Sequence, residues 1–284
     1  LKASRQPNWY LLDSLIKRVN QEREKGHRIT ADIYTYNASS TGLTGVIPTW
    51  VQEGGHRAWI NRMKDLKVRE RLLMEIRREL SEQSPEDILM VGFRTDEMEK
   101  KYLGKTVAEA ADMRDQSPEE AIIDMVIEDD NRIQCIYFSM SEENIRKKIQ
   151  IPWVSFCSDA GSYSDISEDF KTHPRAFGSF IRVLGKYARD ENLITLQEGI
   201  RKLTSLPATN LGLKGRGFLK EGYYADVVIF DSEKVEDKAT FDKPLQFAQG
   251  VEHVLVNGVP VLLNGSHTNN FPGRFVKGPG YIGE

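Results

Sequence analysis

The stretch Ile151-Pro-Trp-Val-Ser-Phe-Cys-Ser-Asp-Ala-Gly161 decides the fold of this chain. Its apolar run from Val154 to Cys157 stops at Ser158-Asp159 and is flanked by helical patterns. This predicts a strand buried in a parallel sheet, and hence an α/β fold. Chemistry in such sheets lies just beyond the carboxyl ends of the strands. Asp159 is therefore placed where a carboxylate can hold a metal or move a proton; the alternative is that it only caps the next helix or turn.

Composition and charge argue against several kinds of partner. The chain has 284 residues, 39% of them hydrophobic and 29% charged, with a formal net charge of −3. This balance gives no reason to expect nucleic acid or an anionic membrane as a partner, and no stretch is long and apolar enough to span a membrane. The two cysteines, Cys135 and Cys157, lie in apolar runs, so we expect buried, reduced thiols and a cytoplasmic location.

Helical and strand-like patterns alternate up to about residue 210. Helices are predicted at 8–25, 56–80, 105–113, 118–128, 141–149, 177–187 and 195–203, and strands at 27–36, 88–93, 133–140 and 154–157. From about residue 211 the sequence becomes β-rich, and Asn257-Gly258 is a strong hairpin signal. We therefore predict an α/β part at 1–210, with a helical insertion at about 44–130, and a β part at 211–284.

Several stretches resemble a known family. Residues 222–231 (Gly-Tyr-Tyr-Ala-Asp-Val-Val-Ile-Phe-Asp) and 254–259 (Val-Leu-Val-Asn-Gly-Val) resemble the C-terminal sandwich segment of the metal-dependent amidohydrolase superfamily. Ala31-Asp-Ile-Tyr-Thr-Tyr-Asn-Ala-Ser-Ser-Thr41, Cys157-Ser-Asp-Ala-Gly161 and the stretch from His173-Pro-Arg to Tyr187 resemble its D-aminoacylase (N-acyl-D-amino-acid deacylase) branch. The resemblance covers most of the chain except roughly residues 56–130. It implies the later part of a (β/α)₈ barrel followed by a segment of a small β-sandwich.

The resemblance also implies metal ligands that this sequence does not contain. The family places a His-x-His pair after its first barrel strand, a cysteine or other bridging ligand after an early strand, and single histidines after strands five and six. None of these is found here, and Leu1-Lys-Ala-Ser4 resembles the residues that directly follow the strand-six histidine. We therefore expect a C-terminal fragment that is inactive alone, whose zinc ligands lie upstream of Leu1 and whose partner is the missing N-terminal half of the barrel.

The same resemblance assigns roles to five residues. Asp159 matches the catalytic carboxylate that takes a proton from water and returns it to the amide nitrogen, and that also touches a metal in two-metal relatives. The family usually has Ser-Asp-Gly where this chain has Ala160 after the aspartate. Arg175, Tyr34 and Ser40 match positions that bind the carboxylate of an N-acyl amino acid. Lys2 matches a lysine that follows the metal histidine, and we expect it to meet an acidic side chain or the substrate carboxylate.

These residues also have structural alternatives. Arg175 could form only a surface salt bridge, and Tyr34 could pack in the core with a satisfied hydroxyl. A neighbouring hydroxyl could take the place of Ser40 if the register shifts. His173 is expected to be a structural neighbour of Arg175 and not a metal ligand.

Together these expectations predict zinc-dependent hydrolysis of the amide bond of N-acyl-D-amino acids, which releases a D-amino acid and a carboxylate. A bound Zn²⁺ would polarise the carbonyl and bring the pKa of its water to about 7. The alternatives are another amidohydrolase, such as a dihydroorotase- or hydantoinase-like cyclic amide hydrolase, and a non-catalytic degenerate scaffold. The helix at 56–80 is expected to form a lid over the site.

Overall fold

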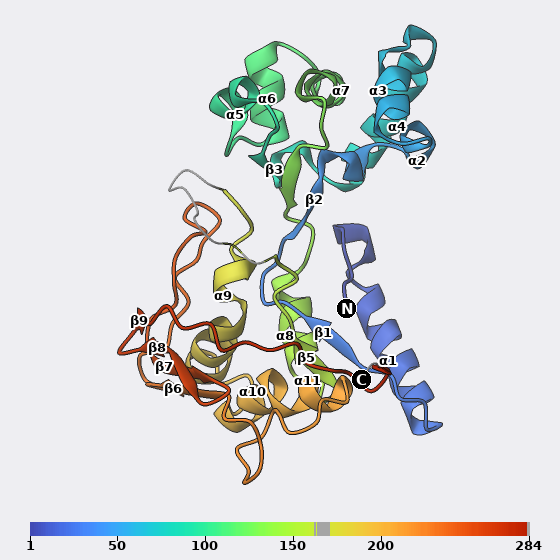
Figure 1. The fold of residues 1–284 in the computed structure, drawn as a ribbon. Helices are drawn as coiled ribbons and strands as arrows, with labels where there is room; N and C mark the ends of the chain where they lie inside the picture. Colours follow the sequence, from blue (N-terminus) through green and yellow to red (C-terminus); the bar gives the residue numbers. More distant parts are fainter. Residues whose placement is uncertain (162, 164–170, 283–284) are drawn as a thin grey trace.

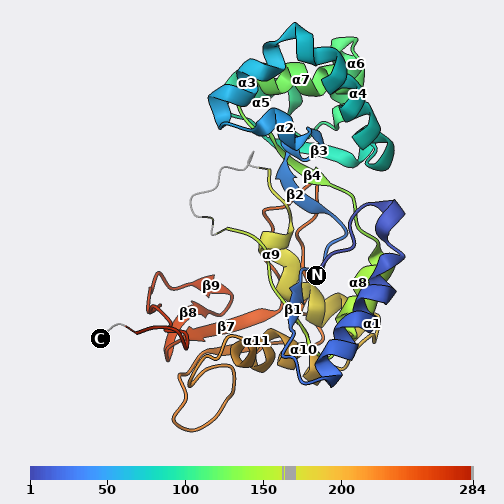
Figure 2. The same cartoon turned by 90° about the vertical axis from the view of Figure 1, so that its right-hand side faces the viewer.

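The protein has a mixed α/β fold, as the sequence predicts. Its structure is a computed structural model that describes residues 1–161, 163 and 171–282. Figures 1 and 2 show three parts: a body around two parallel strands, a largely helical lobe that stands apart from the body, and an antiparallel sheet formed by the last strands. No helix in the described residues combines the length and the apolar character that crossing a bilayer requires.

The body contains the predicted central strand. β5 (Val154–Phe156) pairs in parallel with β1 (Ala31–Ile33), and both strands are shorter than predicted. Ile33, Val154 and Phe156 belong to one buried apolar cluster, whose removal from water stabilises this part of the fold. The surrounding helices are η1 (Gln6–Asn8), α1 (Leu11–Glu24), α8 (Glu142–Ile149), α9 (Arg175–Arg182), the π-helix η4 (Val183–Asp190), α10 (Leu196–Leu203) and α11 (Ser205–Asn210).

The ends of two body helices follow directly from their sequence. Gly26, with φ of 93°, stands where α1 stops, because glycine adopts this left-handed conformation without strain. The Ser141 hydroxyl accepts a hydrogen bond from the Asn144 N–H at 3.3 Å and so caps α8. Acidic residues begin α8 and basic residues end it, as the helix dipole favours. These signals fix the helix that leads into β5.

The lobe is an antiparallel sheet covered by helices. The sheet has the order β2 (Ser39–Gly42), β4 (Gln134–Tyr137), β3 (Ile88–Gly92), and β2 and β4 lead to and from the body. A large apolar cluster inside the lobe is separate from the cluster around β1 and β5. The helices are η2 (Leu43–Val46), α2 (Thr49–Gln52), α3 (His56–Lys64), α4 (Leu66–Glu82), η3 (Pro85–Asp87), α5 (Asp96–Tyr102), α6 (Val107–Arg114) and α7 (Pro118–Asp129).

The lobe departs from the prediction in several places, including α2, which was not predicted. The single helix predicted at 56–80 is two helices, because the Asp65 carboxylate accepts the Lys67 N–H at 2.9 Å and starts α4 as a new helix. β2 lies in a stretch whose small polar residues predict a loop; its pairing with β4 is a long-range contact that the local pattern does not contain. α5 was not predicted, because its seven residues are too few to display a clear helical period.

The last part is a four-stranded antiparallel sheet of β6 (Val227–Phe230), β7 (Val251–Val256), β8 (Val259–Leu263) and β9 (Ser266–His267). Asn257 and Gly258 join β7 to β8 with positive φ values of 50° and 82°, as a two-residue type I′ hairpin requires. The predicted hairpin is therefore confirmed. Val228 and Ile229 of β6 remain about half exposed, so this sheet leaves apolar surface uncovered.

Candidate active site

Asp159 lies three residues beyond the end of β5, in a left-handed backbone conformation with φ of 50°. Its side chain is half exposed. The carboxylate oxygen Oδ2 lies 2.9 Å from Nη1 of Arg175 and 3.5 Å from Nζ of Lys2. One carboxylate at the end of a parallel strand thus faces two cations. This pairing with two cations differs from the alternative role for Asp159, which is only to cap the next helix or turn.

Arg175 is the first residue of α9 and is only 8% exposed. A buried guanidinium is costly unless it is paired, and the Asp159 carboxylate provides a pairing charge, but Nη1 itself has no well-aligned hydrogen bond among the described residues. The guanidinium carbon also lies 4.7 Å from the centre of the Tyr34 ring, and Nζ of Lys2 lies 4.9 Å from the same centre. Arg175 is therefore a buried group in a shared cluster with Lys2, Tyr34 and Asp159, and not a surface salt bridge.

Tyr34 directly follows β1 and is 4% exposed. Its hydroxyl oxygen is buried and has no hydrogen-bond partner among the residues that the structure describes. Buried polar atoms almost always have such a partner, so an orphaned hydroxyl marks a place where a ligand or a further polypeptide segment completes the structure. The alternative of a core tyrosine with a satisfied hydroxyl is therefore wrong.

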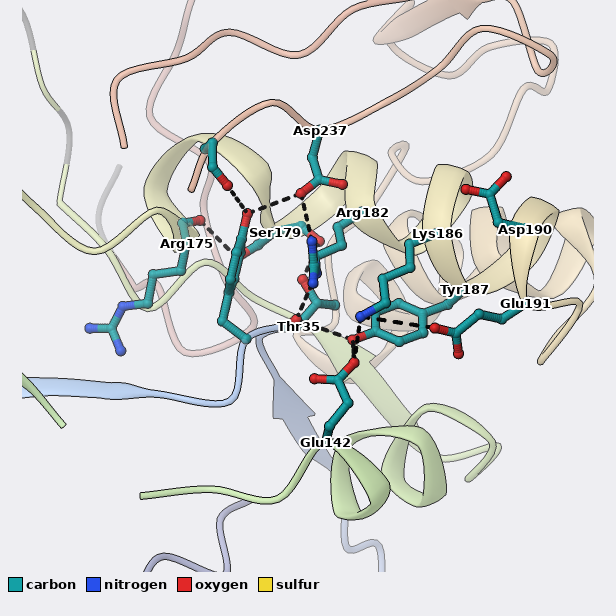
Figure 3. Close-up of polar contacts among 12 residues, drawn as sticks. Thr35, Glu142, Arg175, Ser179, Arg182, Lys186, Tyr187, Asp190, Glu191 and Asp237 are labelled. Atoms are coloured by element: carbon teal, nitrogen blue, oxygen red, sulfur yellow. Dashed lines mark hydrogen bonds and ion pairs between the residues drawn. The ribbon is translucent and has the colours of Figure 1, made fainter. Parts of the chain in front are cut away.

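A polar network holds the segment after β1 against α9 (Figure 3). Nε of Arg182 donates to the carbonyl oxygen of Thr35 at 3.1 Å, and Nη1 of Arg182 pairs with Oδ2 of Asp237 at 2.9 Å. The Thr35 hydroxyl donates to the carbonyl of Ser179 at 3.0 Å, and the Ser179 hydroxyl donates to the carbonyl of Arg175 at 2.7 Å. The backbone that carries Tyr34 and the helix that starts with Arg175 are thereby fixed to each other.

Ser40 lies on β2 and has partners within its own sheet. Its hydroxyl donates to the carbonyl oxygen of Cys135 at 3.0 Å and accepts from Nε2 of Gln134 at 2.9 Å. Ser40 lines the cavity next to Asp159 and Arg175, whereas Ser39 and Thr41 are absent from its described lining. Its hydroxyl can still accept another hydrogen bond from a ligand.

Two cavities meet at Asp159. The smaller one, of about 150 Å³, has Lys2, Tyr34 and Asp159 in its wall. The larger one, of about 340 Å³, has Ser40, Asp159 and Arg175 in its wall. Its remaining described lining comes from both sides, with Val91, Gly92 and Gln134 from the lobe and Ala160, Gly161, Tyr163, Lys171, Thr172 and His173 from the body. All five predicted residues therefore face one of two cavities that share the catalytic candidate.

The lobe contributes its sheet to this site. Strands β2, β3 and β4 line the larger cavity, whereas the helical segment at 56–80 is absent from the described lining of both cavities. The expectation that the helix at 56–80 covers the site is therefore not supported, because the part of the lobe that lines the larger cavity is its sheet.

The described residues do not form a metal site by themselves. Nowhere in them do three or more His, Cys, Asp or Glu side chains gather closely enough to hold a metal ion. The ion-pair partners of Asp159 are the cations Lys2 and Arg175. The expectation of two buried thiols holds for Cys135 but is wrong for Cys157, which is only partly buried because it lies beyond the end of β5, and its thiol donates to Oδ1 of Asp32 at 3.4 Å. A metal next to Asp159 would need additional ligands from outside these residues.

Lys148 is a site residue that sequence analysis missed. It is 3% exposed, it lines the smaller cavity, and burial together with the charge of Lys2 lowers its pKa to about 8. The sequence signal that indicates its burial is the helical period of α8. The spacing that buries Ile145 and Ile149 also buries the lysine between them, because positions three and four residues apart share one face of a helix.

Comparisons with known proteins give these residues a context. Residues 158–262 match the model of the amidohydrolase family. The chain is 43% identical over 142 residues to an N-acyl-D-glutamate deacylase and 41% identical over 139 residues to a D-aminoacylase, both from Alcaligenes xylosoxydans xylosoxydans. Each match covers about half of this chain (50% and 49%) and 28% of the relative.

The structural likeness covers nearly the whole chain. A crystal structure of D-aminoacylase matches 96% of this chain with a TM-score of 0.72 and 27% identity, and a zinc-bound N-acyl-D-glutamate deacylase from Bordetella bronchiseptica matches 91% with a TM-score of 0.69 and 29% identity. The chain corresponds to 48% and 44% of those two chains, so it spans about half the length of these solved relatives.

The chain is thus similar to members of the amidohydrolase superfamily over part of their length. More narrowly, the chain is related to the D-aminoacylase branch of that superfamily, and the predicted resemblance is confirmed.

Proposed function

We propose that this chain carries the acid–base and substrate-carboxylate part of an enzyme that hydrolyses the amide bond of N-acyl-D-amino acids. The proposal depends on one observation above all: a carboxylate at the tip of a parallel strand is flanked by Arg175 and Lys2 beside the orphaned hydroxyl of Tyr34. The names of the relatives, which include deacylases of N-acyl-D-glutamate and N-acyl-D-aspartate, support the substrate class.

The charges of the cluster suit a substrate that brings its own carboxylate. The charged side chains in the described walls of the two cavities are the cations Lys2, Lys148, Lys171 and Arg175 and the carboxylates Asp32 and Asp159. The surplus favours an anion, and a guanidinium can hold a carboxylate through two parallel hydrogen bonds. The Tyr34 hydroxyl would donate a further hydrogen bond, and Ser40 would contact the substrate from the wall of the larger cavity.

Asp159 is the proposed catalytic carboxylate. Hydrolysis of an amide requires that a group take a proton from the attacking water and give it to the departing nitrogen, and a carboxylate positioned within hydrogen-bond reach can do both. Because its side chain is half exposed and faces both cavities, Asp159 is accessible to water and to a substrate held by Arg175.

We further propose that the working enzyme uses zinc whose histidine ligands lie outside the described residues, with Asp159 as a neighbour.

The small parallel sheet supports the proposal that a further polypeptide segment completes this fold. A sheet of two three-residue parallel strands is too small to be stable alone, and parallel strands are normally covered on both faces by other elements. We therefore propose that residues 1–210 are the later part of a (β/α)₈ barrel with an inserted lobe, and that residues 211–284 are a β-sandwich segment. The missing half of the barrel is the partner, and the location is the cytoplasm, where free thiols such as Cys135 and Cys157 stay reduced.

The test is an assay of the full natural gene product, supplied with zinc, on N-acetyl-D-glutamate, N-acetyl-D-methionine, their L enantiomers and a cyclic ureide. We expect release of acetate from the D substrates only. Turnover of the cyclic ureide without turnover of the N-acetyl compounds would assign a hydantoinase-like activity instead. Absence of both activities, together with absence of bound zinc, would identify a degenerate scaffold.

A further inference from the structure

His173 lies at the centre of the aromatic cluster that surrounds the site. It is 4% exposed and stands two residues before Arg175. The edges of its ring meet three aromatic rings, with centroid separations of 5.8 Å to Tyr34, 5.7 Å to Tyr36 and 5.4 Å to Phe241. The imidazole therefore has a fixed orientation, set by packing on several sides.

Both ring nitrogens of His173 are occupied by backbone groups. Nε2 lies 2.9 Å from the carbonyl oxygen of Ala38; because a carbonyl only accepts, Nε2 carries the proton. Nδ1 is then unprotonated and accepts the N–H of Arg175 at 3.1 Å. Burial lowers the pKa of the imidazole to about 3, so the ring stays neutral over the physiological range. It has no free nitrogen for a metal or for proton transfer.

These two hydrogen bonds connect the segments that deliver the proposed substrate ligands. Ala38 immediately precedes β2, which carries Ser40, and Arg175 is the first residue of α9. The N–H groups of the first turn of a helix have no partner within the helix, and Nδ1 of His173 accepts one of them, the N–H of Arg175, from the residue before the N-cap Pro174. The ring of His173 also contacts Tyr34, which lies on a third segment, the one that follows β1. One neutral side chain thus touches all three segments.

We propose that His173 is a positioning residue that sets the place of the Arg175 guanidinium, and with it the place of the substrate carboxylate, by bridging the start of α9 to the segment before β2. Its effect on catalysis rests on the proposed function, and it acts through Arg175 without touching the reacting atoms. The expected consequence is a change in substrate binding more than in turnover, because Arg175 contacts the carboxylate in the ground state and in the transition state alike.

The variants separate the two hydrogen bonds. His173→Phe keeps the ring volume and removes both bonds, whereas His173→Asn keeps an acceptor within reach of the Arg175 N–H. Phe241→Leu is the matched control, because it disturbs the same aromatic cluster and leaves both hydrogen bonds intact. Steady-state kinetics of the full gene product on N-acetyl-D-glutamate should give a KM roughly tenfold higher for His173→Phe and within about threefold of wild type for His173→Asn and Phe241→Leu.

The decisive comparison is a double-mutant cycle with Arg175→Gln. If His173 acts through Arg175, adding His173→Phe to Arg175→Gln leaves KM unchanged beyond the roughly ten- to hundredfold increase of the single Arg175 variant. A KM of the double variant equal to the product of the two single-variant increases would overturn the proposal. So would a KM of His173→Asn as high as that of His173→Phe, since the retained acceptor for the Arg175 N–H should rescue binding.

A measurement on the chain itself distinguishes failure of this proposal from failure of the proposed function. NMR of protein labelled with ¹⁵N in histidine rings should show His173 as the neutral Nε2–H form at pH 7, whether or not the enzyme hydrolyses any N-acyl amino acid. An Nδ1–H form or a charged ring would refute the bridging role. The expected ring form, combined with no turnover of any substrate, would refute only the proposed function.

Discussion

Gly178 offers a sharp test of how α9 is fitted against the segment after β1. A Cβ atom built at this position would lie 1.9 Å from the hydroxyl oxygen of Tyr36, a distance that no real contact allows. The next atoms, the Tyr36 ring carbon Cζ and the Asp237 Cβ, would be 3.1 and 3.4 Å away. Gly178→Ala must therefore displace the Tyr36 hydroxyl or α9 itself.

The magnitude follows from three contributions. Overpacking a buried contact costs about 1–3 kcal/mol. Displacing the Tyr36 hydroxyl also weakens the hydrogen bond in which its single proton is shared between Oδ2 of Asp237 and the carbonyl of Ala239, both at 3.3 Å, a contribution of about 0.5–1.5 kcal/mol. Alanine in place of glycine within a helix restores about 1 kcal/mol. We expect a net destabilisation of about 1–3 kcal/mol. In a Tyr36→Phe background the clashing oxygen is gone, and Gly178→Ala should become neutral or stabilising by up to about 1 kcal/mol.

The assay is urea denaturation of wild type, both single variants and the double variant. Gly185→Ala is the control, because its Cβ would meet the backbone oxygen of Val235 at 2.6 Å and not Tyr36, so its cost should be the same in both backgrounds. An equal cost of Gly178→Ala with and without the Tyr36 hydroxyl would refute this packing, and so would a stabilised single Gly178 variant.

Three further predictions concern stability. Asp237→Asn should destabilise the protein by about 1–3 kcal/mol in urea denaturation, because it removes the charge that pairs with Arg182; an unchanged midpoint would contradict this pairing. Asp129→Ala should destabilise the lobe by about 2–4 kcal/mol, because the fully buried carboxylate accepts the N–H groups of Arg94 and Thr95 and the Thr95 hydroxyl; hydrogen exchange localised to the lobe checks this. The pKa of His173 is about 6.5 in the unfolded chain and about 3 in the folded protein, because burial disfavours the charged ring. The contribution of the neutral ring to the unfolding free energy is therefore fully present above pH 6.5 and is lost as the pH falls toward 3, at up to about 1.4 kcal/mol per pH unit. The unfolding free energy of His173→Asn should therefore fall less steeply than that of wild type in this window, and parallel pH profiles would contradict it.

Local signals account for the parts of the fold that sequence analysis predicted. The apolar run before Asp159, the capped helix at 142–149 and the Asn257-Gly258 hairpin each depend on residues close together in the chain. The same is true of the position of Asp159, which follows from where a strand ends. Site residues recognised through family motifs also line the cavities that meet there.

The remaining features depend on contacts between distant segments, which a local pattern cannot display. Ser40 was expected in a loop, yet its hydroxyl is bonded inside a sheet whose partner strand lies about 95 residues further on. The role of His173 arises from a carbonyl at Ala38, 135 positions away in sequence. The burial of Lys148 could have been predicted from its helical period, but lysine at a buried position contradicts the usual preference. Its Nζ donates to the carbonyl oxygen of Leu1 at 3.3 Å, a partner 147 positions away that no local pattern displays.

Asp159 is the proposed working carboxylate of the site. Its most direct test is the kcat of the full natural gene product on N-acetyl-D-glutamate for Asp159→Asn, beside Asp130→Asn as control. Asp130 has the same 50% side-chain exposure, a similar left-handed backbone with φ of 46°, and two basic neighbours, Arg94 and His56, but lies in the lobe away from both cavities. We predict that kcat falls by roughly 10²–10⁴-fold for Asp159→Asn and changes little for Asp130→Asn. Comparable activity in both variants would contradict the account.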